Sequence, residues 1–99
     1  MAHDFISVAK TGIQLVTSAT SAGATIPLDS AGALPRFIRI AATQPACVRI
    51  GTGTQTALTT DMQVQPGDAV VMSTNGQTHI AAIQVSTAGV VQVSPMELM

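Results

Sequence analysis

The sequence is poor in the side chains that catalysis requires. Of its 99 residues, 9% are charged and 2% are aromatic, there is no Trp or Tyr, and there is one Cys. General acid–base chemistry needs titratable groups placed close together. The carboxylates are scattered along the chain at Asp4, Asp29, Asp61, Asp68 and Glu97, and none is paired with another at a useful spacing. We therefore expect that the protein is not an enzyme.

Nucleic-acid binding, membrane insertion and disulfide bonding are disfavoured as well. The formal net charge is -1, and four basic residues are too few for a phosphate-binding surface. The apolar runs are far shorter than the roughly 20 residues that span a bilayer. The first residues show no basic region followed by an apolar segment, so we expect synthesis in the cytosol without a signal peptide. With a single cysteine, Cys47, no intramolecular disulfide can form.

What the chain does contain is typical of β-strands. Apolar residues make up 46% of the sequence, and they alternate with Thr, Ser and Gln in short segments separated by turn residues. This pattern predicts an all-β protein with about seven or eight short strands, arranged as a small jelly-roll-like β-sandwich or barrel. The expected strands are residues 12–17, 25–28, 36–42, 46–50, 56–64, 69–73, 79–85 and 90–94. We expect one domain at residues 12–95, an N-terminal arm at residues 1–11 and a C-terminal tail at residues 96–99.

Turn signals suggest how these strands pair. The strands at 36–42 and 46–50 are close in sequence and are expected to form a hairpin. Arg39 and Arg49 would then share a face, which requires a partner carboxylate or a diagonal offset. The Asn75-Gly76 pair is a strong two-residue hairpin signal and predicts a second hairpin.

Further local patterns complete the predicted fold. A third hairpin is expected between residues 79–85 and 90–94, and residues 18–24 are expected to form a loop. Alternation within the strands predicts the apolar core. Its expected members are Ile38, Ile40, Val48, Ile50, Val71, Ile83 and Val93, with Leu58, Met62 and Val64 as further candidates.

The few motifs with chemical potential have simpler structural interpretations. Gly51-Thr-Gly-Thr lacks the lysine and the following helix of a phosphate-binding loop. Cys47 lies in an expected strand, where a free cysteine usually acts as a small apolar residue. The Pro66-Gly67-Asp68 turn with His79 eleven residues after Asp68 resembles cupins, and a cupin-like ligand- or metal-binding module stays open as an alternative. Since His3 and His79 are the two histidines, a metal site lacks ligands, and we expect no cofactor.

Low charge points instead toward assembly. A surface with few charges and a net charge near zero tends to associate. Apolar residues on the expected extensions are candidate anchors on a neighbouring subunit. The candidate interface residues are Phe5, Ile6, Arg39, Arg49, Met96 and Leu98. We expect a homo-oligomer, with no nucleic-acid or membrane partner.

A longer pattern is similar to small virion proteins of tailed bacteriophages. It consists of Arg36-Phe-Ile-Arg-Ile-Ala-Ala, Ala46-Cys-Val-Arg-Ile-Gly, the Pro-Gly-Asp turn, His79-Ile-Ala-Ala-Ile-Gln-Val and Val90-Val-Gln-Val-Ser-Pro. The resemblance implies a capsid decoration or cement subunit that forms a small oligomer, with a trimer favoured, and contacts the major capsid protein. It implies a location in the virion after assembly in the host cytoplasm. A neck, tail or fibre component is the alternative within this class.

Overall fold

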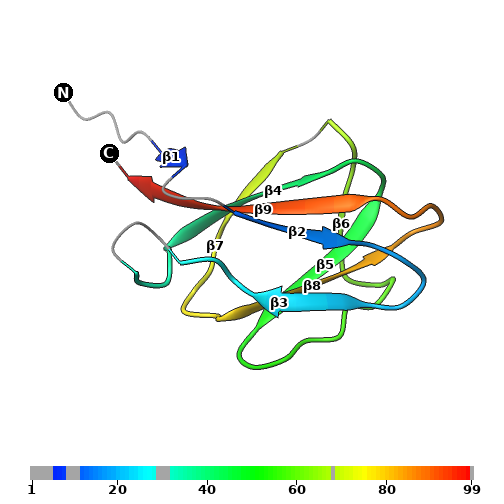
Figure 1. The fold of residues 1–99 in the computed structure, drawn as a ribbon, viewed down its shortest axis with the longest axis horizontal. Helices are drawn as coiled ribbons and strands as arrows, with labels where there is room; N and C mark the ends of the chain where they lie inside the picture. Colours follow the sequence, from blue (N-terminus) through cyan, green and yellow to red (C-terminus); the bar gives the residue numbers. More distant parts are fainter. Residues whose placement is uncertain (1–5, 9–11, 29–31, 68, 99) are drawn as a thin grey trace.

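The fold of the chain is a sandwich of two antiparallel β-sheets, seen in a computed structural model that describes residues 6–8, 12–28, 32–67 and 69–98 (Figure 1). The all-β class is therefore confirmed, and no helix of the described ranges has the length and hydropathy of a membrane span. The described residues form nine strands. They are β1 (Ile6–Val8), β2 (Ile13–Val16), β3 (Ala22–Thr25), β4 (Phe37–Ala42), β5 (Ala46–Gly51), β6 (Met62–Val64), β7 (Val70–Ser73), β8 (His79–Gln84) and β9 (Val90–Leu98).

The two sheets are built from strands that are mostly distant in sequence. Sheet A has the order β1-β9-β4-β7, and β2 also pairs with β9. Sheet B has the order β3-β8-β5-β6. Among the described strands, β5 and β6 are consecutive and paired, whereas each connection from β2 to β5 and from β6 to β9 crosses from one sheet to the other. The chain therefore folds mainly through contacts between remote segments.

This topology corrects the three expected hairpins. Strand β4 lies in sheet A and β5 in sheet B, and the same separation holds for β7 and β8 and for β8 and β9. The short connections are therefore arches between the two sheets. Burial of both inner faces decides the pairing, and local turn preference does not override it.

Most strand positions agree with the sequence pattern, but β3, β6 and β9 differ. Strand β3 begins at Ala22, inside the segment expected to be a loop, and it ends where the expected strand at 25–28 begins. Strand β6 is limited to Met62–Val64, because residues 52–61 take a different path described below. In the opposite direction, β9 continues through the expected domain end at residue 95 to Leu98, and its last residues pair with β1.

The core lies between the sheets and follows the alternation of the strands. Its buried cluster is made of Leu15, Ile26, Ile38, Ile40, Ala46, Val48, Val64, Ile80, Ala82, Val91 and Val93. The expected core residues Ile38, Ile40, Val48, Val64 and Val93 belong to it.

Other expected core residues were wrong or only partly buried. Ile50 and Ile83 are half-buried, and Leu58, Met62 and Val71 are among the exposed large apolar side chains. In β7 the inward positions are Val70 and Met72, which pack against the core, so Val71 points outward. A short apolar run such as Val70-Val71-Met72 does not reveal by itself which of its faces is buried.

Candidate assembly surface

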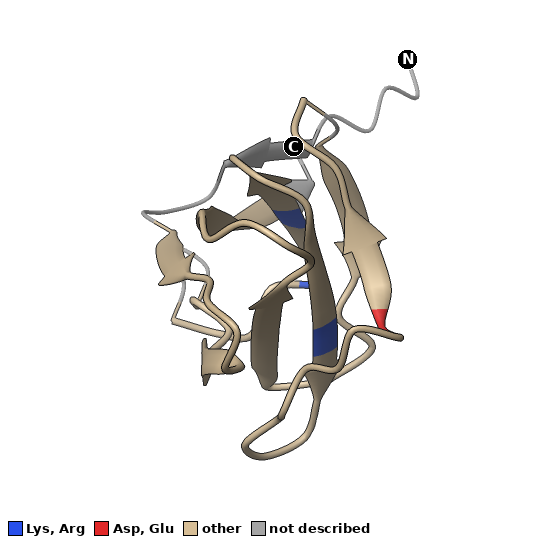
Figure 2. Cartoon of the chain, turned by 90° about the vertical axis from the view of Figure 1, so that its right-hand side faces the viewer, with Lys and Arg blue, Asp and Glu red and all other residues tan. Residues whose placement is uncertain are grey.

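The outer face of sheet A is a surface of the sandwich with few charged residues. Because side chains alternate along each strand, the register of β2, β9, β4 and β7 identifies the outward residues. They are Gln14, Val16, Phe37, Arg39, Ala41, Val71, Ser73, Val90, Gln92, Ser94 and Met96. We call this set the sheet A face. Arg39 is its one charged member, and charged residues are sparse over the whole described ribbon (Figure 2).

Large parts of the sheet A face are open to solvent. Val16 on β2 is 69% exposed and Val71 on β7 is 47% exposed, and Gln14 on β2 and Gln92 on β9 are exposed as well. Ser94 and Met96 are buried on the same face, and their neighbours Arg39 and Phe37 on β4 are half-buried. An exposed sheet face usually carries alternating polar and charged residues. Here two valines occupy such positions.

Arg39 lies in the middle of this face. Its neighbours across the strands are Val71 on β7 and Ser94 on β9, and its side chain is half-buried. Within the described ranges, no hydrogen bond or ion pair engages its guanidinium. A cation among uncharged neighbours is available to a carboxylate on another molecule.

Arg49 lies on the opposite side of the sandwich, so the expected sharing of a face with Arg39 was wrong. It points outward from β5 in sheet B, where it contacts Asp61. Its Nε and a terminal nitrogen donate to Asp61 Oδ1 at 3.2 and 3.1 Å. The expected partner carboxylate is therefore present, but it balances Arg49 alone.

Residues 52–61, which we call the strap, lie over the outer face of sheet B. The strap is tied to β5 by Asp61 and by the Cys47 Sγ, which donates to the Thr59 carbonyl oxygen at 3.5 Å. At its other end the Ala57 amide donates to Ser21 Oγ at 2.8 Å, next to β3. Under the strap Ala81 is fully buried although it points outward from β8. The outer face of sheet B is thus covered by the strap, whereas the outer face of sheet A is open.

The strap also determines the chemistry of Cys47. The side chain is 2% exposed, and burial together with the charge of Asp61 raises the pKa of its thiol. A reactive thiolate needs the opposite environment, partly exposed and electropositive. The prediction that Cys47 acts as a small buried residue is confirmed by its burial.

The structure describes three of the four expected terminal anchors, Ile6, Met96 and Leu98. Phe5 lies outside the described residues. Ile6 in β1 pairs with Leu98 in β9, so the backbones of the expected arm and tail form one ladder. Met96 pairs with Phe37, and this register places it on the sheet A face, where it is 7% exposed. No sequence signal linked these segments, because residues 6–8 do not alternate clearly.

The histidine considered for a metal site lies on the outer side of sheet B. His79 pairs with Thr25 and Gly51, and its Nδ1 is 2.7 Å from Thr78 Oγ1. His3 and Asp68 lie outside the described residues. Among the residues that are described, no three His, Cys, Asp or Glu side chains gather closely enough to hold a metal ion.

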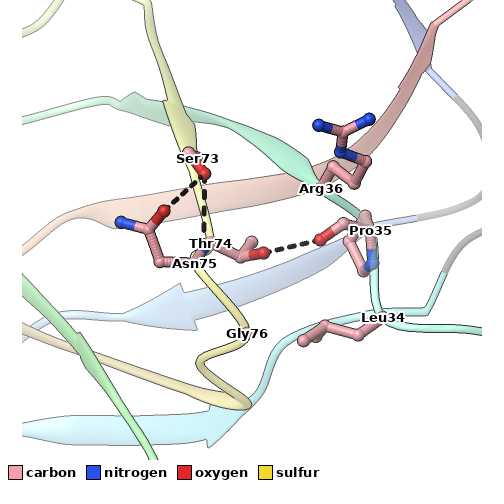
Figure 3. Close-up of a pocket in the computed structure, with 7 residues that line it drawn as sticks. All are labelled: Leu34, Pro35, Arg36, Ser73, Thr74, Asn75 and Gly76. Carbon is pink, nitrogen blue, oxygen red and sulfur yellow. Dashed lines mark hydrogen bonds between the residues drawn. The ribbon is translucent and has the colours of Figure 1, made fainter.

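A shallow hollow lies at the end of the sandwich where β4 begins and β7 ends. It has a volume of about 320 Å³ and is lined by Leu34–Arg36 and Ser73–Gly76 (Figure 3). Its polar groups bond to one another: Thr74 Oγ1 donates to the Pro35 carbonyl oxygen at 2.7 Å, and Ser73 Oγ lies 3.0 Å from Asn75 Oδ1. The side chains of Ser73, Thr74 and Asn75 are therefore engaged within the hollow, which Arg36 also lines.

Comparisons with known proteins add no relative. No protein-family model, no curated protein and no solved structure matches this chain.

Proposed function

We propose that this protein is a non-catalytic structural subunit that acts by assembly, with the sheet A face as its contact surface. The observation that carries the proposal is the contrast between the two sheets. The outer side of sheet B is covered by the strap, whereas the sheet A face exposes Val16 on β2 and Val71 on β7, the latter beside Arg39. Exposed apolar surface of this kind is typical of sites where another protein binds.

The energetics of such an assembly follow from apolar burial. Removing apolar surface from water contributes on the order of 25 cal/mol per Å², and a particle repeats the contact many times. With few charged residues, the long-range repulsion between copies is small. Arg39 then supplies specificity, because its burial in a contact without a carboxylate would be unfavourable.

We infer further that the strand order is that of a jelly roll. The order β2-β9-β4-β7 in one sheet and β3-β8-β5-β6 in the other supports this inference. Jelly rolls occur in viral capsid proteins, lectins and cupins. Together with the sequence resemblance, this arrangement supports a bacteriophage virion protein, and within that class a capsid decoration or cement subunit. A neck, tail or fibre component is the alternative.

The test is binding to phage heads from which small bound proteins have been removed, measured by co-sedimentation. We expect saturable binding that is lost on Val16→Asp, which puts a charge on the sheet A face. The matched control is Val85→Asp, a change of an exposed valine outside that face. Both positions are exposed, so neither change disturbs the core. Absence of binding by the unmodified chain, or equal losses for the two variants, would contradict the proposal.

A further inference from the structure

Strand β7 forms an open edge of sheet A. Its one partner among the described strands is β4. The Thr74 amide donates to the Arg36 carbonyl oxygen at 2.9 Å, so residue 74 directs its backbone groups toward β4. In an antiparallel strand the backbone groups of successive residues point alternately toward the partner strand and away from it. The N–H and C=O groups of Val71 and Ser73 therefore point away from β4 and out of the sheet. A row of backbone donors and acceptors is available to another strand.

Strand β7 lacks the devices that protect other edges. Natural sheets block their edges with charged residues, proline, very short strands or a covering segment. Strand β3 has Pro27 shortly after it and the strap beside it, and β6 has three residues. Strand β2 lies next to β3 and shares its side of sheet A with β1. By contrast Val70-Val-Met-Ser73 carries no charge and no proline.

We propose that two copies of this chain pair edge to edge through β7, antiparallel about a twofold axis, so that sheet A becomes continuous across the dimer. The register follows from the burial pattern. Directly opposed residues point to the same face of a sheet, so inward Val70 and Met72 must face inward residues of the other copy. The central register places Val71 opposite Val71 and Val70 opposite Met72.

In this register the free backbone groups of Val71 form hydrogen bonds, and the Arg39 side chains of the two copies stay far apart. Each Val71 donates to and accepts from its counterpart, because its N–H and C=O point outward along the edge. The opposed side chains are apolar, which favours cross-strand packing. The two Arg39 side chains are three strand spacings apart, roughly 14 Å, which exceeds the screening length of about 8 Å in physiological salt.

The inference rests on the proposed assembly role, but it fixes a different number of copies. A twofold pairing closes as a dimer, whereas the resemblance to virion proteins favours a trimer. The first measurement is therefore the mass of the purified full chain by light scattering after size exclusion. We expect twice the 10.1 kDa of the chain. A monomer or a trimer would overturn the edge pairing and leave the binding of phage heads as a separate question.

Proline substitution tests the edge directly. Val71→Pro removes an N–H that makes no bond to β4, so the fold of the single chain tolerates it. We expect this variant to be monomeric. The control is Val16→Pro on β2, where the Thr17 amide donates to the Gly89 carbonyl oxygen, so the N–H of residue 16 likewise points away from its partner strand β9. That variant should remain a dimer. A dimeric Val71→Pro protein would overturn the proposal.

Two further variants keep the result interpretable if proline disturbs folding. Val71→Lys retains the backbone donor and places two like charges opposite each other, so it should also give a monomer. Val71→Cys brings two cysteines to a Cα separation of roughly 5.5 Å, within the range for a disulfide. We expect an oxidised covalent dimer for Val71→Cys and none for Val16→Cys, since native Cys47 is buried. A cross-linked Val16→Cys dimer without a Val71→Cys dimer would place the contact elsewhere.

Discussion

Replacing Ile40 by alanine is expected to cost a large part of the stability of this protein. Ile40 is fully buried in β4, where its neighbours within sheet A are Val93 on β9 and Val70 on β7. The substitution removes three carbon atoms, worth about 2.4 kcal/mol at 0.8 kcal/mol each. A residual cavity adds to this, because two strands hold the site open, and the total becomes about 3–4 kcal/mol.

The assay must not depend on aromatic fluorescence, because the chain has no Trp and no Tyr. Urea unfolding followed by far-ultraviolet circular dichroism gives the free energy of unfolding. For a domain of this size the loss corresponds to a fall in Tm of about 12–30 °C. All variants are compared at one protein concentration, since the proposed association would contribute to apparent stability.

A matched change on the outer face provides the control. Val16→Ala alters a side chain that is 69% exposed, so we expect a change within about 0.5 kcal/mol. Ile40→Ala and Val16→Ala lie on opposite faces of sheet A. Similar losses for the two variants would refute the assignment of inner and outer faces from which the assembly surface is derived.

Three further predictions concern the strap and the loops. Hydrogen bonds from the Leu58 amide and then from Arg49 hold the pKa of Asp61 below its usual value. The stability that ionised Asp61 contributes is therefore full above pH about 4 and is lost as the pH falls further. Urea unfolding at a series of pH values should show this loss on the acid side, and Asp61→Asn should reduce the pH dependence. Native Cys47 should react with a thiol reagent far more slowly than the unfolded chain, and equal rates would show that the strap does not cover it. Thr17→Val should cost about 1–3 kcal/mol in calorimetry, because buried Thr17 Oγ1 accepts a hydrogen bond from the Gly89 amide at 2.8 Å.

The turn at Asn75 and Gly76 shows what the sequence predicts well and where it misleads. Both residues adopt positive φ, 50° and 77°, as a two-residue hairpin turn requires, and the Gln77 amide closes the turn on Thr74. The flanking strands nevertheless separate. The Thr74 amide bonds to Arg36 in sheet A, while the Thr78 amide bonds to Gly51 in sheet B. The conformation of a turn depends on neighbouring residues and can be predicted from the sequence. Strand pairing, by contrast, depends on partners far away in the chain.

The candidate surface was less predictable than the fold class. Arg39 was identified from the sequence, but its face and its neighbours follow from the register of β4 with β7 and β9. The strap could not be foreseen, because residues 52–61 are polar and rich in Thr, without a pattern that predicts a covering segment. Its role depends on tertiary contacts of Ala57 and Asp61.

The position of β9 has a consequence for how the protein is made. This strand lies in the middle of sheet A and pairs with β1, β2 and β4, yet it is the last of the described strands in chain order. Strands β4 and β7 pair with each other, but β1 and β2 have no partner within sheet A until residues 90–98 have been synthesised. Sheets formed from remote segments also fold slowly, in milliseconds to seconds. Strands β1 and β2 therefore stay unpaired until β9 has been made, and sheet A is completed late.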